Sequence, residues 1–358
     1  MKAKNTLTEI LSIDYPFVQA PMLGVTTPEM VAMISNEGAL GSLPIGGLPP
    51  TQALALIQKT KGLTNRPFAV NVFANAGPTA INENEWNQMQ ALIENFCARY
   101  EVPYERQSFE ARKFFSYEDQ VEILCSEKIP LVSFTFGVLS DETINRLHQH
   151  SVSLIGTATS VEEASLLAGK GVDIITAQGI EAGGHRGTFL HENIPQVGLM
   201  ALLPQIVDAV DKPVLAAGAI ADGRAIKAAM ILGAAGVVVG SAFVGCDESA
   251  ANAKYKKVLQ QRTDTSTTLT TSYTGRWFRV INNEFINTVE SSGLAVNQFQ
   301  VQQLLTGFLR SLHQHKNAEK FLPMPAGQNV RKTTAVDAAT ILRDLLREAE
   351  WLHVEQQS

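Results

Sequence analysis

The stretch VDIITAQGIEAGGHRG, residues 172–187, joins an apolar, β-branched run to a glycine-rich loop that carries one histidine. The run Val172–Ala177 predicts a buried strand, and the glycines after it predict a loop at the strand end. Glycine lacks a Cβ, so such a loop lets a ligand approach the main chain, and His185 adds an ionisable imidazole. An ordinary turn at Gly183-Gly184 with an exposed His185 is the alternative interpretation.

The same alternation of short apolar runs with amphipathic stretches recurs along the chain and predicts parallel strands joined by crossover helices. The eight predicted strands are Phe17–Ala20, Ala39–Leu43, Phe68–Phe73, Leu131–Phe134, Ser153–Gly156, Val172–Ala177, Val214–Ala217 and Val237–Gly240. The predicted helices are Thr27–Glu37, Pro50–Lys61, Tyr117–Glu127, Asp141–Gln149, Ser160–Gly169, Val197–Val210 and Asp222–Leu232. This pattern, without a G-x-G-x-x-G turn, favours an α/β fold of the (β/α)8 TIM-barrel type over an open doubly wound sheet.

Two regions exceed the eight-fold repeat. Residues 76–115 contain ENEWNQMQALIENFCARYEV, which predicts an inserted helix, and residues 250–330 are predicted to be mostly helical with polar loops. Both follow strands on the carboxyl side, where barrel active sites are built, so we expect them to form a cap that binds substrate. Residues 1–75 and 116–249 then form the barrel, with a final helix in 331–358. The polar run TDTSTTLTTS (263–272) predicts a loop or flexible connection.

Composition excludes several classes of protein. The chain of 358 residues is 45% hydrophobic and 18% charged, which is typical of a folded protein with a sizeable core. A net charge of −6 without a dense basic stripe argues against nucleic acid as a partner. No apolar run is long enough for a membrane span and no leader pattern begins the chain, so we expect a cytoplasmic protein without membrane contact. The three scattered cysteines and the lack of H-E-x-x-H predict no metal site.

Two adjacent strand ends predict a phosphate site. Barrels often hold phosphate in the loops after the seventh and eighth strands. Here AAGAIADG (216–223) ends the seventh strand and Gly240-Ser241 ends the eighth. Gly218 and Gly240 would admit an anion to the main chain, and Ser241 offers a hydroxyl donor, although two tight turns would look similar. A nucleotide monophosphate cofactor suits this pattern.

Other strand ends carry neutral polar groups. Asn71 lies in the third strand, Gln178 follows the sixth, and the main chain of Met22-Leu23 follows the first. Amides and backbone groups at converging strand ends suit the edge of a flavin ring, which presents fixed donors and acceptors.

Seven segments together resemble the nitronate monooxygenase family, formerly called 2-nitropropane dioxygenases, from about residue 15 to residue 330. They are QAPMLGVTTPEMVAMISNEGALGSLP (19–44), RPFAVNVF (66–73), PLVSFTFG (130–137), TAQGIEAGGHRG (176–187), PVLAAGAIADG (213–223), GAAGVVVGSAF (233–243) and PAGQ (325–328). In this chain Pro323–Ala326 precede Gly327-Gln328, where the family commonly has an aromatic residue, which implies a different pocket shape.

The resemblance implies an FMN-dependent barrel enzyme that oxidises alkyl nitronates such as propionate 3-nitronate with O2, giving a carbonyl product and nitrite. It implies that His185 is the catalytic histidine. The FMN contacts implied by the matching motifs are Met22, Leu23, Asn71, Gln178, Gly183, Gly218, Val238, Val239, Gly240 and Ser241.

Three alternatives remain open at this point. An FMN-dependent enoyl-[acyl carrier protein] reductase shares the Glu-Ala-Gly-Gly-His loop but typically has Gly-Gly-Met where this chain has Ala20-Pro21-Met22. An NAD(P)H:quinone reductase-like flavoenzyme is the second. A barrel that only binds flavin, or handles a phosphosugar without it, is the third, although carboxylates and lysines are scarce at the strand ends. Use of NAD(P)H or quinone, and assembly into a homodimer, are equally undecided by sequence.

Overall fold

The barrel is closed by eight parallel strands. The computed structural model describes residues 4–75, 77–78, 81–108, 113–191, 193–330 and 333–352. The strand order is β1-β9-β8-β6-β5-β4-β3-β2, and a parallel bridge between Val18 and Leu40 joins the two outer strands. The strands are β1 (Phe17–Gln19), β2 (Gly41–Pro44), β3 (Phe68–Phe73), β4 (Leu131–Thr135), β5 (Ser153–Ala158), β6 (Ile174–Gln178), β8 (Val214–Ala217) and β9 (Gly236–Val239). The predicted TIM barrel and its strands are confirmed.

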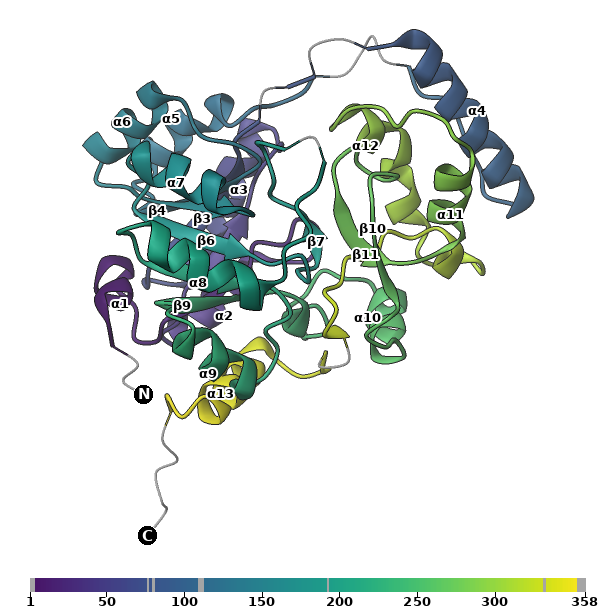
Figure 1. The fold of residues 1–358 in the computed structure, drawn as a ribbon. Helices are drawn as coiled ribbons and strands as arrows, with labels where there is room; N and C mark the ends of the chain where they lie inside the picture. The colour runs from purple at the N-terminus through teal and green to yellow at the C-terminus, as the bar shows by residue number, and fades with distance from the viewer. Residues whose placement is uncertain are drawn as a thin grey trace.

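Helices surround this sheet (Figure 1). They are α2 (Pro28–Asn36), α3 (Pro50–Leu63), α5 (Glu118–Ser126), α6 (Asp141–Gln149), α7 (Val161–Gly169), α8 (Leu199–Ala209), α9 (Gly223–Ile231) and α13 (Ala338–Glu348). α13 packs against α2 and α9 and so completes the ring. It is the final helix expected in 331–358, of which residues 331–332 and 353–358 lie outside the described residues.

The amino-terminal end of the barrel is plugged. Helix α1 (Thr6–Leu11) places Leu7 and Leu11 in one hydrophobic cluster with interior side chains of the strands, among them Val18 and Leu215. A Cβ on Gly236 would lie 2.6 Å from Leu7 Cδ2, so the helix fits closely against β9. The carboxyl end of the strands is therefore the end at which a cavity can open.

The regions expected to form the cap, 76–115 and 250–330, supply most of a second hydrophobic core. Its helices are α4 (Glu83–Arg99), α10 (Ala253–Gln260), α11 (Glu284–Ser291), α12 (Val301–Thr306), and the 3₁₀ helices η2 (Gly307–Leu312) and η3 (Ala318–Lys320). They lie together on one side of the barrel (Figure 1). Val25 and Val244 of the barrel also belong to this core and so connect the two parts.

The prediction for residues 263–272 was wrong over Thr267–Thr270. These residues form β10, which pairs antiparallel with β11 (Phe278–Ile281), and β11 pairs in turn with β7 (Gly184–His185). A small sheet therefore stands in a region expected to be helices and loops. Threonine is β-branched and suits extended backbone, but the partner that fixes this strand lies several residues later, so the local composition indicated only polarity.

Candidate active site

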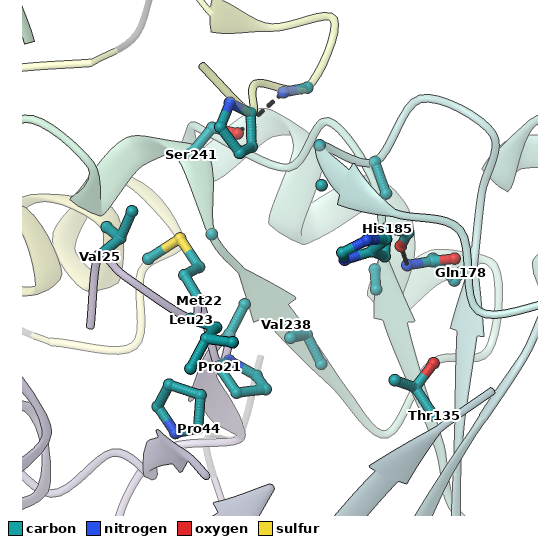
Figure 2. Close-up of a pocket in the computed structure, with 18 of the residues that line it drawn as sticks. Pro21, Met22, Leu23, Val25, Pro44, Thr135, Gln178, His185, Val238 and Ser241 are labelled. Carbon is teal, nitrogen blue, oxygen red and sulfur yellow. Dashed lines mark hydrogen bonds between the residues drawn. The ribbon is translucent and has the colours of Figure 1, made fainter. Parts of the chain in front are cut away.

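A cavity of about 230 Å³ opens at the carboxyl end of the barrel strands. Residues from every barrel strand end line it, together with Pro325, Gly327, Asn329 and side chains from the second core. Figure 2 shows Pro21, Met22 and Pro44 on one wall and His185 and Gln178 on the opposite wall. The barrel and the residues above it thus share one site.

The glycine-rich loop after β6 is fixed by hydrogen bonds at both ends. Gln178 Nε2 donates to the carbonyl of His185 at 3.0 Å, and the Gly187 N–H donates to Gln178 Oε1 at 2.8 Å. The buried Arg186 guanidinium donates to the carbonyls of Gln178 and, at 3.0 Å, Pro195. The side chain of Gln178 therefore positions the histidine loop as well as lining the cavity.

A buried carboxylate holds the residues that follow this loop. Glu163 is 0% exposed and accepts hydrogen bonds from Thr159, Thr188, Phe189 and Leu190. The sequence Ser-Val-Glu-Glu predicts a capping box at α7, and Ser160 does cap the helix, accepting from the Glu163 N–H at 3.2 Å. The Glu163 side chain instead bonds to Thr159 and the 188–190 backbone, because burial there demands several donors for a carboxylate.

Four phenylalanines surround His185. The ring-centroid distances to it are 4.6 Å for Phe278, 5.3 Å for Phe136, 5.8 Å for Phe299 and 6.5 Å for Phe73. Burial lowers the pKa of His185 to about 3, and the positive charges of Arg310 and Arg276 act in the same direction. His185 is consequently neutral at neutral pH.

Backbone strain accompanies this aromatic surround. Phe136 has φ +79° and Gln300, next to Phe299, has φ +70°, a region that side chains other than glycine rarely occupy. Such backbone conformations persist only where the surrounding structure holds them in place, and they are concentrated at functional sites.

Thr274 orients the imidazole. His185 Nε2 lies 2.9 Å from Thr274 Oγ1, while the Thr274 hydroxyl donates to the Arg276 carbonyl at 3.2 Å. Because a hydroxyl has one proton, the oxygen of Thr274 then accepts from Nε2–H. This network assigns the Nε2-protonated tautomer and leaves Nδ1 as the proton acceptor of the ring.

The other end of the cavity is built from glycines and one hydroxyl. Gly218 has φ +140°, which favours glycine, and a Cβ on Gly183 would lie 2.4 Å from Gly327 N. The Gly327 N–H donates to Ser241 Oγ at 3.0 Å, so the proton of that hydroxyl is left to donate elsewhere. Figure 2 shows Ser241 above Met22, across the cavity from Thr135.

The structure brings nearly all the residues selected from sequence to this cavity. Those that line it are Met22, Leu23, Asn71, Gln178, Gly183, His185, Gly218, Val238, Gly240 and Ser241. Val239 is 1% exposed and belongs to the hydrophobic core, because successive side chains of β9 point to opposite faces. Its carbonyl accepts from the Ala20 N–H at 2.9 Å, so it supports the turn before Met22.

Several site residues were not predicted. Thr274, Tyr255, Gln303 and Arg310 come from the region 250–330, as does Phe278 of β11, and Tyr255 and Phe278 belong to the second core. A single hydroxyl or arginine in an irregular polar region carries no sequence signal for a site, because its neighbours there are set by the tertiary fold. The motifs at 134–137 and 325–328 were noticed, but their contacts with His185 and Gly183 emerge only from the structure.

Comparison with known proteins gives the family. The nitronate monooxygenase family model matches residues 4–348. This chain belongs to the nitronate monooxygenase family. A Staphylococcus haemolyticus protein named "Probable nitronate monooxygenase" is 37% identical over 97% of this chain and 98% of its own length. A protein with the same printed name from Staphylococcus saprophyticus is 36% identical over 98% of each chain.

Solved structures agree with this assignment. A nitroalkane oxidase from Streptomyces ansochromogenes superposes with a TM-score of 0.84 at 32% identity, covering 97% of this chain and 98% of its own. FabK from Thermotoga maritima has a TM-score of 0.74 at 24% identity, over 97% of this chain and 96% of its own, and shows a shared fold alone. The family match makes the protein an oxidoreductase of the nitronate monooxygenase type. No helix in the described part of the chain is long and apolar enough to cross a membrane.

Proposed function

We propose that the protein binds FMN in this cavity and oxidises alkyl nitronates, such as propionate 3-nitronate, with O2 to a carbonyl compound and nitrite. The observation that carries the proposal is a neutral His185 in an aromatic surround, sharing one cavity with the glycine-rich strand ends at Gly218 and Gly240. His185 would act on the substrate while the glycine-rich end holds the cofactor phosphate.

The strand ends fit a phosphate. A Cβ on Gly240 would approach Ala20 Cβ to 3.3 Å and Met22 Sδ to 3.6 Å, so the missing side chain keeps this part of the cavity open. Gly218 lies at the neighbouring strand end, and the Ser241 hydroxyl retains a proton to donate. Backbone N–H groups and a hydroxyl are suitable partners for a phosphate dianion. We assign the phosphate of FMN to Gly218, Gly240 and Ser241.

The remaining lining fits an isoalloxazine ring. Asn71 and three threonines, Thr135, Thr157 and Thr176, present neutral polar groups along the strand ends, while Met22 and Val238 present apolar surface. A flavin ring has this combination of a polar edge and an apolar body. We assign the ring contacts to Asn71, Gln178, Val238 and the main chain of Met22-Leu23, with Gly183 close beside them. Bound FMN would supply the electron transfer to oxygen.

His185 has two tasks in this proposal. Its Nδ1 accepts the α-proton of a neutral nitroalkane, and it hydrogen-bonds a substrate that enters already as the nitronate. The lowered pKa keeps the imidazole in its basic form, although it also weakens the base until the negative charge that develops on the nitro group, as the proton leaves, raises that pKa again. Preformed nitronates need no proton abstraction, so we expect them to be the better substrates.

Two measurements on the purified full chain test this function. Acid release should yield a yellow supernatant whose flavin chromatographs as FMN, and addition of propyl-1-nitronate should cause O2 uptake with formation of nitrite. A colourless protein after expression with added riboflavin, release of FAD, or flavin-loaded protein that consumes no O2 with any nitronate would overturn the proposal.

A further inference from the structure

Arg310 is the one residue with a permanent charge among the described residues that line the cavity. It lies in η2, whose neighbouring Leu309 is 0% exposed in the second core and so fixes the position of the chain. Arg310 is an exposed residue that lines the cavity, and within the described part of the protein no hydrogen bond or ion pair occupies its guanidinium. The cavity therefore has a cation without a protein counter-charge.

Nearby arginines behave differently. Arg276 donates to the Thr188 carbonyl at 3.3 Å and stacks over the Phe136 ring at 4.4 Å. Arg279 donates to the Ile180 carbonyl at 3.0 Å. Arg279 is buried and Arg276 half-buried, and their partners hold the loops around His185. Arg310 is exposed and has no such partner among the described residues.

The surroundings of Arg310 favour the binding of an anionic ligand. Arg310 is exposed by its accessible surface, but the protein packed around part of its side chain still lowers its pKa. A partly desolvated cation is costly unless an anion pairs with it. The guanidinium presents a planar fork of N–H donors, which matches two oxygens of a planar anion.

We propose that Arg310 determines substrate specificity by binding a planar two-oxygen anion of the substrate. Resting on the function proposed above, this anion is the nitronate group itself or a carboxylate elsewhere on the same molecule. His185 is neutral and cannot supply the positive charge, so Arg310 is the group in this cavity that distinguishes an anionic substrate from a neutral nitroalkane.

The location favours substrate over the cofactor phosphate. The phosphate partners assigned above lie at the ends of β8 and β9, whereas Arg310 lies in η2 and lines the cavity with Tyr255 and Gln303 of the region 250–330. Its positive charge also lowers the pKa of His185, which lines the same cavity.

The test compares Arg310→Met, which keeps most of the apolar stem, with Arg310→Lys and with Lys316→Met. Lys316 is an exposed cation near Arg310 in sequence and pairs with Glu101 outside the site. Steady-state kinetics are measured with propyl-1-nitronate, propionate 3-nitronate and neutral 1-nitropropane, and flavin content is measured for each variant. The unreactive carboxylate butyrate serves as a binding probe through its effect on the melting temperature.

Arg310→Met should raise KM about 10- to 100-fold for propionate 3-nitronate or for both nitronates, with less than about a 3-fold change for 1-nitropropane. Arg310→Lys should recover part of the loss, and Lys316→Met should resemble the wild type. Loss with both nitronates identifies the nitronate group as the partner, whereas loss confined to propionate 3-nitronate identifies its carboxylate.

Equal changes for neutral and anionic substrates, or loss of flavin from Arg310→Met, would overturn the proposal. The butyrate measurement separates this proposal from the function. If the wild type turns over none of the three compounds, the proposed function fails, but a stabilisation by butyrate that Arg310→Met abolishes still supports the anion site. Absence of that stabilisation in the wild type counts against it.

Discussion

Replacing Thr274 with valine removes the hydrogen bond that orients His185 and keeps nearly the same shape. The contact joins residues 89 positions apart at 2.9 Å and connects the barrel loop to the turn before β11. In Thr274→Val the Nε2–H of the half-buried imidazole has no acceptor within the protein, which costs about 1–3 kcal/mol. If that cost falls on the reactive arrangement, the rate falls about 5- to 150-fold.

The assay is kcat/KM for propyl-1-nitronate and 1-nitropropane, measured beside flavin content and melting temperature. Thr274→Ser is the matched control, since it retains the hydroxyl and loses only a methyl group. The hydroxyl also accepts from the Arg276 N–H at 3.3 Å, so a lower melting temperature is expected for the valine variant as well.

We expect Thr274→Val to remain yellow and to lose rate, and Thr274→Ser to stay within about 3-fold of the wild type. The reasoning is refuted if the valine variant keeps wild-type kcat/KM on both substrates. A serine variant as slow as the valine variant would equally refute it, because the hydroxyl would then not be the group that matters.

Further predictions concern the loop, its support and the pH response. Gly183→Ala should lower the melting temperature and flavin content, since its Cβ would lie 2.4 Å from Gly327 N. Gly184→Ala, at φ +75° in open space, should cost only about 1–2 kcal/mol of backbone strain. A larger decrease in melting temperature and flavin content for Gly184→Ala than for Gly183→Ala would contradict this. In urea unfolding, Glu163→Gln should lower the free energy of unfolding by about 1–3 kcal/mol, whereas Glu162→Gln, at an exposed position, should change it little. Equal decreases in both variants would show that the buried carboxylate of Glu163 has no special role. The folded-state pKa of His185 is lowered from 6.5 to about 3, so the folded protein binds fewer protons than the unfolded chain in this pH range. The contribution of His185 to the free energy of unfolding is therefore present above pH 6.5 and is lost as the pH falls toward 3. Unfolding of the flavin-free protein should show this decrease in stability, and His185→Asn should make the decrease smaller. A kcat/KM limb near pH 6.5 that His185→Asn removes would contradict the lowered pKa.

The strands were predictable because each is buried on both faces and appears as a short apolar run. VNVF in β3 and VLAA in β8 are examples, each followed by a turn or polar residue that ends it. The histidine loop was predictable for a related reason, since several glycines directly after a buried apolar run indicate a loop at the end of a strand. Here local sequence and tertiary environment point to the same structure.

The contacts above the barrel were not predictable in this way. Thr270 is 0% exposed although its neighbourhood reads as a polar loop, because β11 supplies the pairing that buries it. Arg310 stands in a stretch with Ser311, His313 and Lys316, which is typical of a solvated surface. Its place in the cavity depends on how η2 packs onto the second core, and that packing has no local signature.

The most direct test of the central claim, that His185 performs the acid–base step in a flavin-bearing cavity, is the turnover of His185→Asn on matched neutral and anionic substrates. We predict a variant that still releases FMN on acid treatment but loses about 10²–10⁴-fold in rate with 1-nitropropane, and distinctly less with preformed propyl-1-nitronate. Equal losses on both forms would remove the base role from His185. An undiminished rate on both would contradict the account, because the neutral, half-buried imidazole at this position would then take no part in the reaction.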